Sequence, residues 1–404
     1  MQDNEKKPAL RFKGFTDPWE QRKLKELYFQ LTERNTDLLP YQKTLSVATM
    51  SFKTDGNGAA DTSLANYKRL RTGDIAFEGH TSKEFRYGRF VLNDVGDGIM
   101  SPRFSALRPL HEMPINFWKY YIHYEPIMRK VLVNSTKAGT MMNELVINDF
   151  LQGSILVPSM AEQQAIGRFF KQLDTLITLH QRKYEKLVNI KKSMLNKMFP
   201  PNGASVPEIR FKGFTDPWEQ RKLEEYLEVS SQKNFEGIYT KEDVLSVSGD
   251  FGIVNQIEFQ GRSFAGASVA NYGVVETGDI VYTKSPLKSN PYGIIKANKG
   301  KNGIVSTLYA VYKPKQSVNP EFVQIYFEQD ARMNNYMHPL VNKGAKNDMK
   351  VSAENALKGQ IVFPDIKEQR TISEFFRNLE TLITLHQREH IKPILEVKRV
   401  KRNE

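Results

Sequence analysis

The sequence RFKGFTDPWEQRKL occupies residues 11–24 and returns without a change at residues 210–223, an offset of 199 residues. Fourteen identical residues do not occur twice in one chain by chance, so this stretch identifies an internal repeat. Whatever fold follows the first copy is therefore expected to follow the second.

Further blocks return in the same order. SLANY at residues 63–67 corresponds to SVANY at 268–272. EQQAIGRFFKQLDTLITLHQR at 162–182 corresponds to EQRTISEFFRNLETLITLHQR at 368–388. The offset grows from 199 to 205 and then to 206, so the second copy has gained residues before its SVANY block. The two halves share one order of elements, while the sequence between the blocks diverges.

The divergent parts, residues 25–157 and 224–363, mix strand and helix patterns. Apolar alternation punctuated by glycine predicts short strands. A helical period that begins near Pro114 and Pro320 predicts helices after them, because proline suits a first helical turn. The strands are expected around TGDIAF, GRFVLN and IMSPRFSAL in the first half and around TGDIVY, YGIIKAN and GIVSTLYAVY in the second. We expect an α+β domain in each half, with the repeated blocks as a frame and the divergent parts as two different recognition surfaces.

The last repeated block predicts a long helix in each half. From Ala161 to Met198 such a helix would extend about 57 Å at 1.5 Å per residue, and apolar residues recur along it with the seven-residue spacing of a coiled coil. A pseudo-twofold relation between the halves would pack the two helices antiparallel, with the domains at opposite ends. The residues expected in this packing are Ile166, Phe169, Phe170, Leu173, Leu176, Ile177 and Leu187, and Ile372, Phe375, Phe376, Leu379, Leu382 and Ile383.

The remaining repeated residues set the boundaries. Phe12, Phe15, Pro18 and Trp19, with their copies in the second half, are interpreted as an apolar clip that folds onto the helix ends. FPPNGASVPEI at residues 199–209 is interpreted as a linker, because it holds three prolines and a glycine. The predicted divisions are domains at 1–158 and 210–364, long helices at 159–199 and 365–404, and the linker at 200–209.

Composition and charge narrow the function. The 404 residues are enough for two to three domains, and 58 Lys and Arg against 46 Asp and Glu give a net charge of +12, which favours a polyanion such as nucleic acid. The chain has no cysteine, which excludes disulfides and thiolate metal sites. No signal peptide and no uncharged apolar run of about 18 residues occurs. We therefore expect a cytoplasmic protein.

Motifs that resemble catalytic sites are weak. His386-Gln-Arg-Glu-His390 has the spacing of an inverted zinc peptidase, but the first copy has a tyrosine in place of the second histidine, so a solvated helix surface is expected instead. Asn290-Pro-Tyr-Gly is an incomplete version of an amino-methyltransferase loop, and Asp365 with Glu396 does not form a credible magnesium site. No phosphate-binding loop is present. We expect no metal site and no catalytic residues.

Cationic residues in the divergent parts are interleaved with aromatic and amide residues. Lys and Arg neutralise phosphates, and Arg and Asn can also bind base edges. Any one of these residues is as consistent with an ordinary solvated loop, but as a set at corresponding places in the two halves they favour DNA. The candidate DNA-binding residues are Lys68, Arg69, Arg71, Lys83, Arg86, Tyr87, Arg89 and Lys137 in the first half, and Lys284, Lys288, Asn290, Tyr292, Lys296, Lys301, Asn302, Lys343, Lys346 and Asn347 in the second.

The tandem plan, the RFKGFTDPWEQRKL segment and the HQR-ended helix resemble the specificity subunit of type I restriction-modification systems over essentially the whole chain. The resemblance implies two α+β target recognition domains, each reading one half of a bipartite double-stranded DNA site, separated by two long antiparallel coiled-coil helices. It also implies a non-catalytic subunit whose partners are two modification (methyltransferase) subunits and restriction subunits. S-adenosylmethionine, ATP and magnesium would then be bound by those partners and not by this chain.

The second long helix departs from the pattern of the family, and two alternative functions are left open. After Arg388 the second helix reads EHIKPILEVKRVKRNE, and Pro393 is expected to kink or end it, which leaves symmetric docking of the partners open. The alternatives to a specificity subunit are a stand-alone DNA adenine methyltransferase or nuclease, and a coiled-coil scaffold that binds DNA without sequence preference. The bases recognised do not follow from the sequence.

Overall fold

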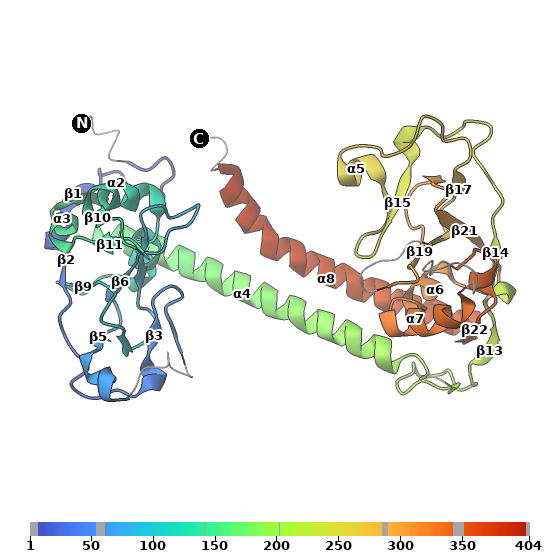
Figure 1. Cartoon of the computed structure of the whole chain (residues 1–404), viewed down its shortest axis with the longest axis horizontal. Coiled ribbons are helices and arrows are strands. Elements are labelled where there is room, and N and C mark those ends of the chain that lie inside the picture. The colour runs from blue at the N-terminus through green and yellow to red at the C-terminus, as the bar shows by residue number, and fades with distance from the viewer. Residues whose placement is uncertain are drawn as a thin grey trace. The chain divides into compact units, whose positions relative to one another are not determined.

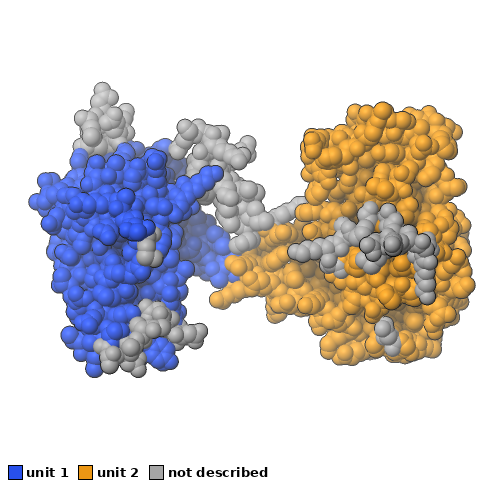
Figure 2. Space-filling view, viewed as in Figure 1, with its two compact units in different colours: residues 1–178 blue, residues 179–404 orange. Residues whose placement is uncertain are grey.

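The computed structural model describes residues 7–53, 61–140, 142–201, 203–284, 290–341 and 351–400, with side chains at all of these except 61, 62 and 388–400. The chain divides into two compact units, residues 1–178 and 179–404, called unit 1 and unit 2 below (Figure 2). Within the described ranges no helix is both long enough and apolar enough to cross a membrane.

Unit 1 is built on a four-stranded antiparallel sheet of order β2-β9-β6-β7, with two-stranded pairs beside it. Its helices cover the core formed with this sheet, in which Trp118 and Phe150 are fully buried. The strands are β1 (Glu20–Lys23), β2 (Tyr28–Gln30), β3 (Leu45–Ser46), β4 (Ser51–Phe52), β5 (Lys68–Leu70), β6 (Ile75–Glu78), β7 (Arg89–Leu92), β8 (Gly98–Met100), β9 (Ala106–Pro109), β10 (Thr136–Lys137), β11 (Glu144–Leu145) and β12 (Ser154–Val157). The helices are α1 (Ile115–Tyr121), α2 (Glu125–Ser135), α3 (Ile147–Gln152) and the first half of α4 (Met160–Lys197).

Unit 2 repeats this plan with the sheet β14-β21-β18-β19 (Figure 1). Its strands are β13 (Glu219–Lys222), β14 (Leu227–Val229), β15 (Leu245–Ser248), β16 (Gly252–Asn255), β17 (Gly273–Val275), β18 (Ile280–Thr283), β19 (Ile295–Ala297), β20 (Gly303–Val305), β21 (Tyr309–Pro314) and β22 (Gln360–Phe363). Its helices are α5 (Gln256–Gln260), α6 (Pro320–Tyr326), α7 (Asp330–Met337), α8 (Ile366–Val400) and the second half of α4. The strands expected from the apolar alternation are confirmed, whereas each expected helical segment is broken into two helices.

The repeated entry segment joins each domain to its long helix. β1 pairs with β12, and β13 pairs with β22, so each entry segment lies against the strand that leads into α4 or α8. The Arg11 guanidinium donates two hydrogen bonds of 2.6 and 2.7 Å to the buried carboxylate of Glu162. Arg210 and Glu368 repeat this pairing at 2.8 and 2.7 Å. The identical residues are therefore a frame, as predicted.

The aromatic clip belongs to the same frame. The Phe12 ring meets the Phe169 ring edge-on at 5.7 Å in unit 1, and Phe211 meets Phe375 at 5.8 Å in unit 2. Trp218 is buried in the core of unit 2. These contacts confirm the packing role predicted for the clip.

The repeated Thr-Gly-Asp is a turn. The Asp74 carboxylate accepts the backbone N–H of Arg71 at 2.7 Å, and Asp279 accepts that of Glu276 at the same distance. The glycine before each aspartate has a left-handed φ, which is 93° at Gly73 and 95° at Gly278. Residues with a side chain adopt this conformation only at a cost in free energy. The motif forms the same turn in both units, and this turn precedes β6 and β18.

The two long helices run antiparallel where unit 2 contains both. His180 of α4 lies beside His386 of α8, with 3.0 Å between their Nδ1 atoms, and Lys191 donates to Glu380 at 2.8 Å further along α4. As the numbers rise along α4 they fall along α8, which establishes the antiparallel direction. His386 is half-buried against His180, so the prediction of a solvated helix surface at this residue is wrong.

Burial along the helices agrees only in part with the expected packing set. Ile372, Phe376 and Leu379 are buried, and Ile166, Phe170, Leu173, Ile177, Leu187, Phe375 and Ile383 are half-buried. Phe169, Leu176 and Leu382 are 43%, 52% and 46% exposed, so these three are not buried in the structure. They lie on the helix positions beside the packed row, where a seven-residue period places side chains at its edge.

Two further expectations are corrected. Phe199, assigned to the linker, is 1% exposed and belongs to the core of unit 2. Pro393 does not end the second long helix, because α8 continues to Val400.

Candidate nucleic-acid interface

Two loops of unit 1 interlock at one edge of the sheet. The backbone N–H of Asn143, which precedes β11, donates to the Gly79 carbonyl at 2.9 Å, and the Asn143 side chain donates to the Arg86 carbonyl at 3.3 Å. A Cβ atom on Gly79 would lie 2.1 Å from the Asn143 carbonyl oxygen, so only glycine permits this approach. The β6–β7 loop and the β10–β11 turn therefore form one surface.

Three of the predicted cations lie exposed on this surface. They are Lys83 and Arg86 in the β6–β7 loop and Lys137 in β10, and none of them pairs with a carboxylate among the residues described. Arg89 is half-buried beside them, with its guanidinium 5.0 Å from the Phe85 ring centroid and one N–H donating to the Ala48 carbonyl. Tyr87 packs against the core of unit 1. We call Lys83, Arg86 and Lys137 the loop cations.

Sequence reasoning missed two residues of this surface. Arg103 is exposed, with its guanidinium 5.4 Å from the Phe104 ring centroid and 3.9 Å from the Met142 sulfur in the β10–β11 turn. His80 is exposed at the start of the β6–β7 loop, and its Nδ1 lies 2.5 Å from the buried Glu78 carboxylate. The only sequence signal was the cationic character of the segments, because the approach of the two loops depends on tertiary structure.

The other three predicted cations of unit 1 hold strands together. The Lys68 amine donates to the Phe104 carbonyl at 2.6 Å, and burial lowers its pKa. Arg69 pairs with Asp37 and Asp97, at 3.3 and 3.5 Å. These donors are directed at protein atoms in the structure.

Arg71 belongs to a charged cluster of the same kind. It donates to Glu33 at 2.8 Å, and Arg108 also donates to Glu33. The hydrogen bond from Arg71, supported by that from Arg108, lowers the pKa of Glu33 to about 2. Glu33 is therefore ionised at neutral pH and fixes Arg71 in this cluster.

Burial contradicts two of the predictions in unit 2. Asn290 is 7% exposed and donates to the Asp330 carboxylate at 2.8 Å. Lys296 is 8% exposed on β19, and burial lowers its pKa. Neither side chain can reach a base or a phosphate from this position, so both predictions of DNA contact are wrong.

The remaining candidates of unit 2 differ in their surroundings. Asn302 is exposed and accepts the backbone N–H of Thr277 at 2.8 Å, while Lys301 is exposed beside it. Lys284 donates to the Thr307 carbonyl at 3.2 Å, and Tyr292 packs against the core. Lys288, Lys343, Lys346 and Asn347 lie outside the described residues.

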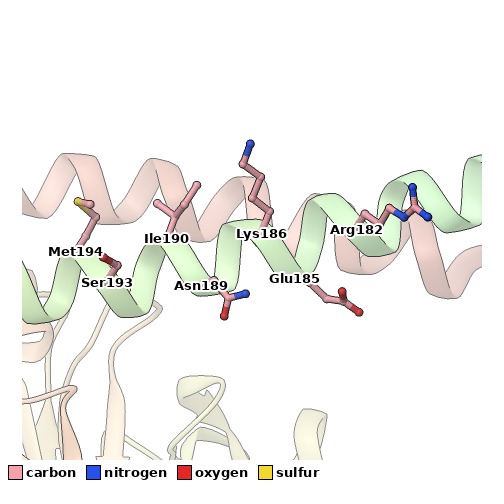
Figure 3. Close-up of a pocket in the computed structure, with 7 residues that line it drawn as sticks. All are labelled: Arg182, Glu185, Lys186, Asn189, Ile190, Ser193 and Met194. Carbon is pink, nitrogen blue, oxygen red and sulfur yellow. The ribbon is translucent and has the colours of Figure 1, made fainter. Parts of the chain in front are cut away.

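A groove of about 480 Å³ runs along α4 in unit 2, and its described lining residues all come from that helix (Figure 3). Ile190 and Met194 extend on the opposite side of α4 from Glu185 and Asn189. The lining is charged at one end, with Arg182, Glu185 and Lys186, and mixes polar and apolar side chains at the other, and it brings no nucleophile and base together. Across the described ranges no group of three or more His, Cys, Asp or Glu could hold a metal ion. Asp365, considered above for a magnesium site, accepts the N–H groups of Lys367 and Glu368 and so caps α8.

The chain is similar to known proteins of one kind. Residues 17–189 match the model of the family described as type I restriction modification DNA specificity domain. A putative type I restriction enzyme MjaX specificity subunit from Methanocaldococcus jannaschii is 22% identical over 352 residues, which cover 81% of this chain and 76% of that protein.

A solved structure shares the fold. The S subunit of a type I restriction-modification system from M. genitalium is 14% identical, with a TM-score of 0.53 over 98% of this chain and 97% of that one. The HsdS subunit from Thermoanaerobacter tengcongensis is 17% identical, with a TM-score of 0.47 over 97% and 96% of the two chains.

Proposed function

We propose that this chain, whose residues 17–189 belong to the type I restriction modification DNA specificity domain family, gives a type I restriction-modification complex its DNA sequence specificity. The internal repeat extends the same plan to the second half of the chain, so each unit contributes one target recognition domain. The target is then a bipartite double-stranded DNA site with one half-site for each domain.

The observation that carries the proposal is the interlocked loop surface of unit 1. The frame residues are identical in the two halves, whereas the loops that present the loop cations are divergent. Exposed Lys and Arg without a protein counter-ion bind phosphates and position a domain on the duplex. A constant frame with variable cationic loops is the arrangement expected of a subunit that places different readers on one scaffold.

We propose that the partners carry the chemistry. Two modification subunits would supply S-adenosylmethionine and methylate adenine, and restriction subunits would supply ATP- and magnesium-dependent cleavage. This chain would bind no cofactor and act by recognition alone. The buried position of Asn290 supports this division, because an amino-methyltransferase loop needs that side chain at the reacting base.

A double charge reversal tests the loop surface. Lys83→Glu with Arg86→Glu is expected to weaken binding of the assembled methyltransferase to its site roughly a hundredfold, because each lost contact is worth about 1–3 kcal/mol. The slope of log affinity against log salt should fall by about 2, one for each phosphate contact removed. Both are measured by fluorescence anisotropy with a duplex that carries the methylated site.

The matched control is Lys13→Glu with Lys23→Glu, which changes the net charge equally at exposed cations of the frame. It should leave the affinity within about threefold of the wild type, since long-range fields are screened at physiological salt. Equal losses in the two double variants would show that total charge, and not the loop surface, holds the DNA.

A further inference from the structure

The β6–β7 loop of unit 1 begins with a histidine that a buried carboxylate holds in place. The Glu78 side chain, at the end of β6, is 7% exposed, whereas the His80 side chain is 58% exposed. Glu78 Oε1 lies 2.5 Å from His80 Nδ1 and accepts the backbone N–H of His80 at 3.1 Å. Among the residues that the structure describes, the Glu78 side chain makes no other hydrogen bond or ion pair. The imidazole therefore satisfies a buried acid that would otherwise lack a side-chain partner there.

This contact determines which atom of the ring is left for a ligand. An ionised carboxylate only accepts hydrogen bonds, so Nδ1 of His80 is the donor to Glu78. Nε2, on the far side of the ring, is then the one hydrogen-bonding atom that the exposed part of the side chain offers. A ring already held in this way loses little conformational freedom when it binds.

The backbone on both sides of His80 is also held. The preceding residue, Gly79, accepts the backbone N–H of Asn143 at 2.9 Å. Further along the loop, Ser82 and Phe85 exchange hydrogen bonds of 3.2 and 3.0 Å, and the Phe85 side chain is buried. His80 lies between these two anchored points, so its exposed ring has a defined position on the loop surface.

The charge of the Glu78–His80 pair does not suit a phosphate. The ionised carboxylate with a neutral ring has a single negative charge, and with a protonated ring it has no net charge. The pair thus adds no positive charge to the surface in either state, whereas each of the loop cations adds one. Phosphate contacts depend on such charges. A single hydrogen-bonding atom in a fixed position suits a base edge instead, because geometry decides which base fits there.

The repeat does not carry the pair into the second half. At the offset of 205 that relates β6 to β18, Glu78 corresponds to Thr283 and His80 to Ser285. Thr283 accepts the backbone N–H of Ile294 at 2.9 Å, which is a contact within the domain. Frame residues are identical in the two halves, but a residue that reads one half-site is expected to differ between two unlike readers. The pair follows the second pattern.

We propose that His80 reads one base pair of the half-site bound by unit 1, through a hydrogen bond between Nε2 and a base edge, and that Glu78 positions the ring. The inference rests on the proposed function and adds to it a residue that discriminates between bases. The loop cations keep the phosphates as their partners.

His80→Ala in the assembled methyltransferase tests the role of the ring. Methylated sites from a random plasmid library should show that the preference for the native base falls about tenfold or more at one position, because one direct base contact is lost. That position should lie in the half-site that changes when residues 25–157 are exchanged. The slope of log affinity against log salt should stay unchanged, since no phosphate contact is removed.

Variants of Glu78 separate positioning from folding. His80→Ala leaves a buried carboxylate without its partner, which destabilises the domain. Glu78→Gln with His80→Ala removes that charge and should lose the same base preference. Glu78→Gln alone keeps an oxygen that accepts from Nδ1, so the preference should stay within about threefold of the wild type. Glu78→Ala releases the ring and should relax the preference as His80→Ala does, and thermal unfolding followed by circular dichroism reports the stability of each variant.

His111→Ala is the matched control, because His111 is exposed in unit 1 between β9 and α1, outside both loops of the interface. It should keep every base preference. The inference is overturned if His80→Ala keeps them too, if both half-sites relax, or if all sequences bind more weakly with a salt slope lower by about 1, as a lost phosphate contact would cause. A wild-type complex without any sequence preference would instead contradict the proposed function itself.

Discussion

Exchanging residues 25–157 for the same region of a relative with a different target is expected to change one half of the methylated site and leave the other half and the gap unchanged. The junctions fall at Leu24 and Pro158, and the frame residues that hold the domain are contributed from before the first junction and after the second. β1 pairs with β12 through the backbone, and Arg11 binds Glu162 outside the exchanged region. Any domain with this frame can be accommodated, because backbone hydrogen bonds do not depend on side chains.

The effect should be close to all-or-none. Specific binding of DNA exceeds non-specific binding by at least about a thousandfold, so methylation of the original half-site should fall below detection. Sequencing of methylated adenines in a plasmid library measures it. The reciprocal exchange of residues 224–363 is the control, and it should change only the opposite half. A single exchange that alters both halves would show that the domains do not read independently.

Phe199→Ala is expected to destabilise unit 2 by about 3–5 kcal/mol, the cost of truncating a buried phenylalanine. Its ring contacts Trp218, Phe322, Tyr326 and Phe376, and the Arg332 guanidinium lies 4.7 Å from its centroid. Alanine would leave a cavity at the point where α4 enters the core.

Hydrogen exchange followed by mass spectrometry measures this loss for each unit separately. Peptides from the β18–β21 sheet should exchange faster in the variant, and those from the β6–β9 sheet should not change. Phe169→Ala is the control, because its side chain is 43% exposed and its truncation should cost less than about 1 kcal/mol. A cost that small for Phe199→Ala would mean that the end of α4 does not belong to the core.

The repeat made the frame predictable. A segment that survives unchanged in two diverging halves marks residues whose contacts cannot vary, and Arg11 with Glu162 shows why: a buried carboxylate needs its guanidinium partner. The glycines and the apolar alternation predicted the strands, because these patterns depend on only a few neighbouring residues. The long helices followed from their period.

The candidate site was harder to predict because charge in a sequence does not reveal burial. Lys296 was expected in a DNA-binding loop, yet it lies in β19 near the cluster of Lys191, Glu328 and Glu380, which brings together α4, α8 and the turn between α6 and α7. Arg103 was overlooked because its neighbours suggested a strand. Phe199 was assigned to a linker because of the prolines after it, although its contacts come from residues far along the chain.

The methylation pattern produced by the complex of the wild-type chain tests the central claim most directly. With modification subunits and S-adenosylmethionine, a random plasmid library should acquire methylated adenines only in a split sequence: two unlike half-sites separated by a stretch of fixed length in which every base occurs. A single continuous sequence, two copies of one half-site in a perfect palindrome, or methylation without sequence preference would contradict the account of two different readers on one repeated frame.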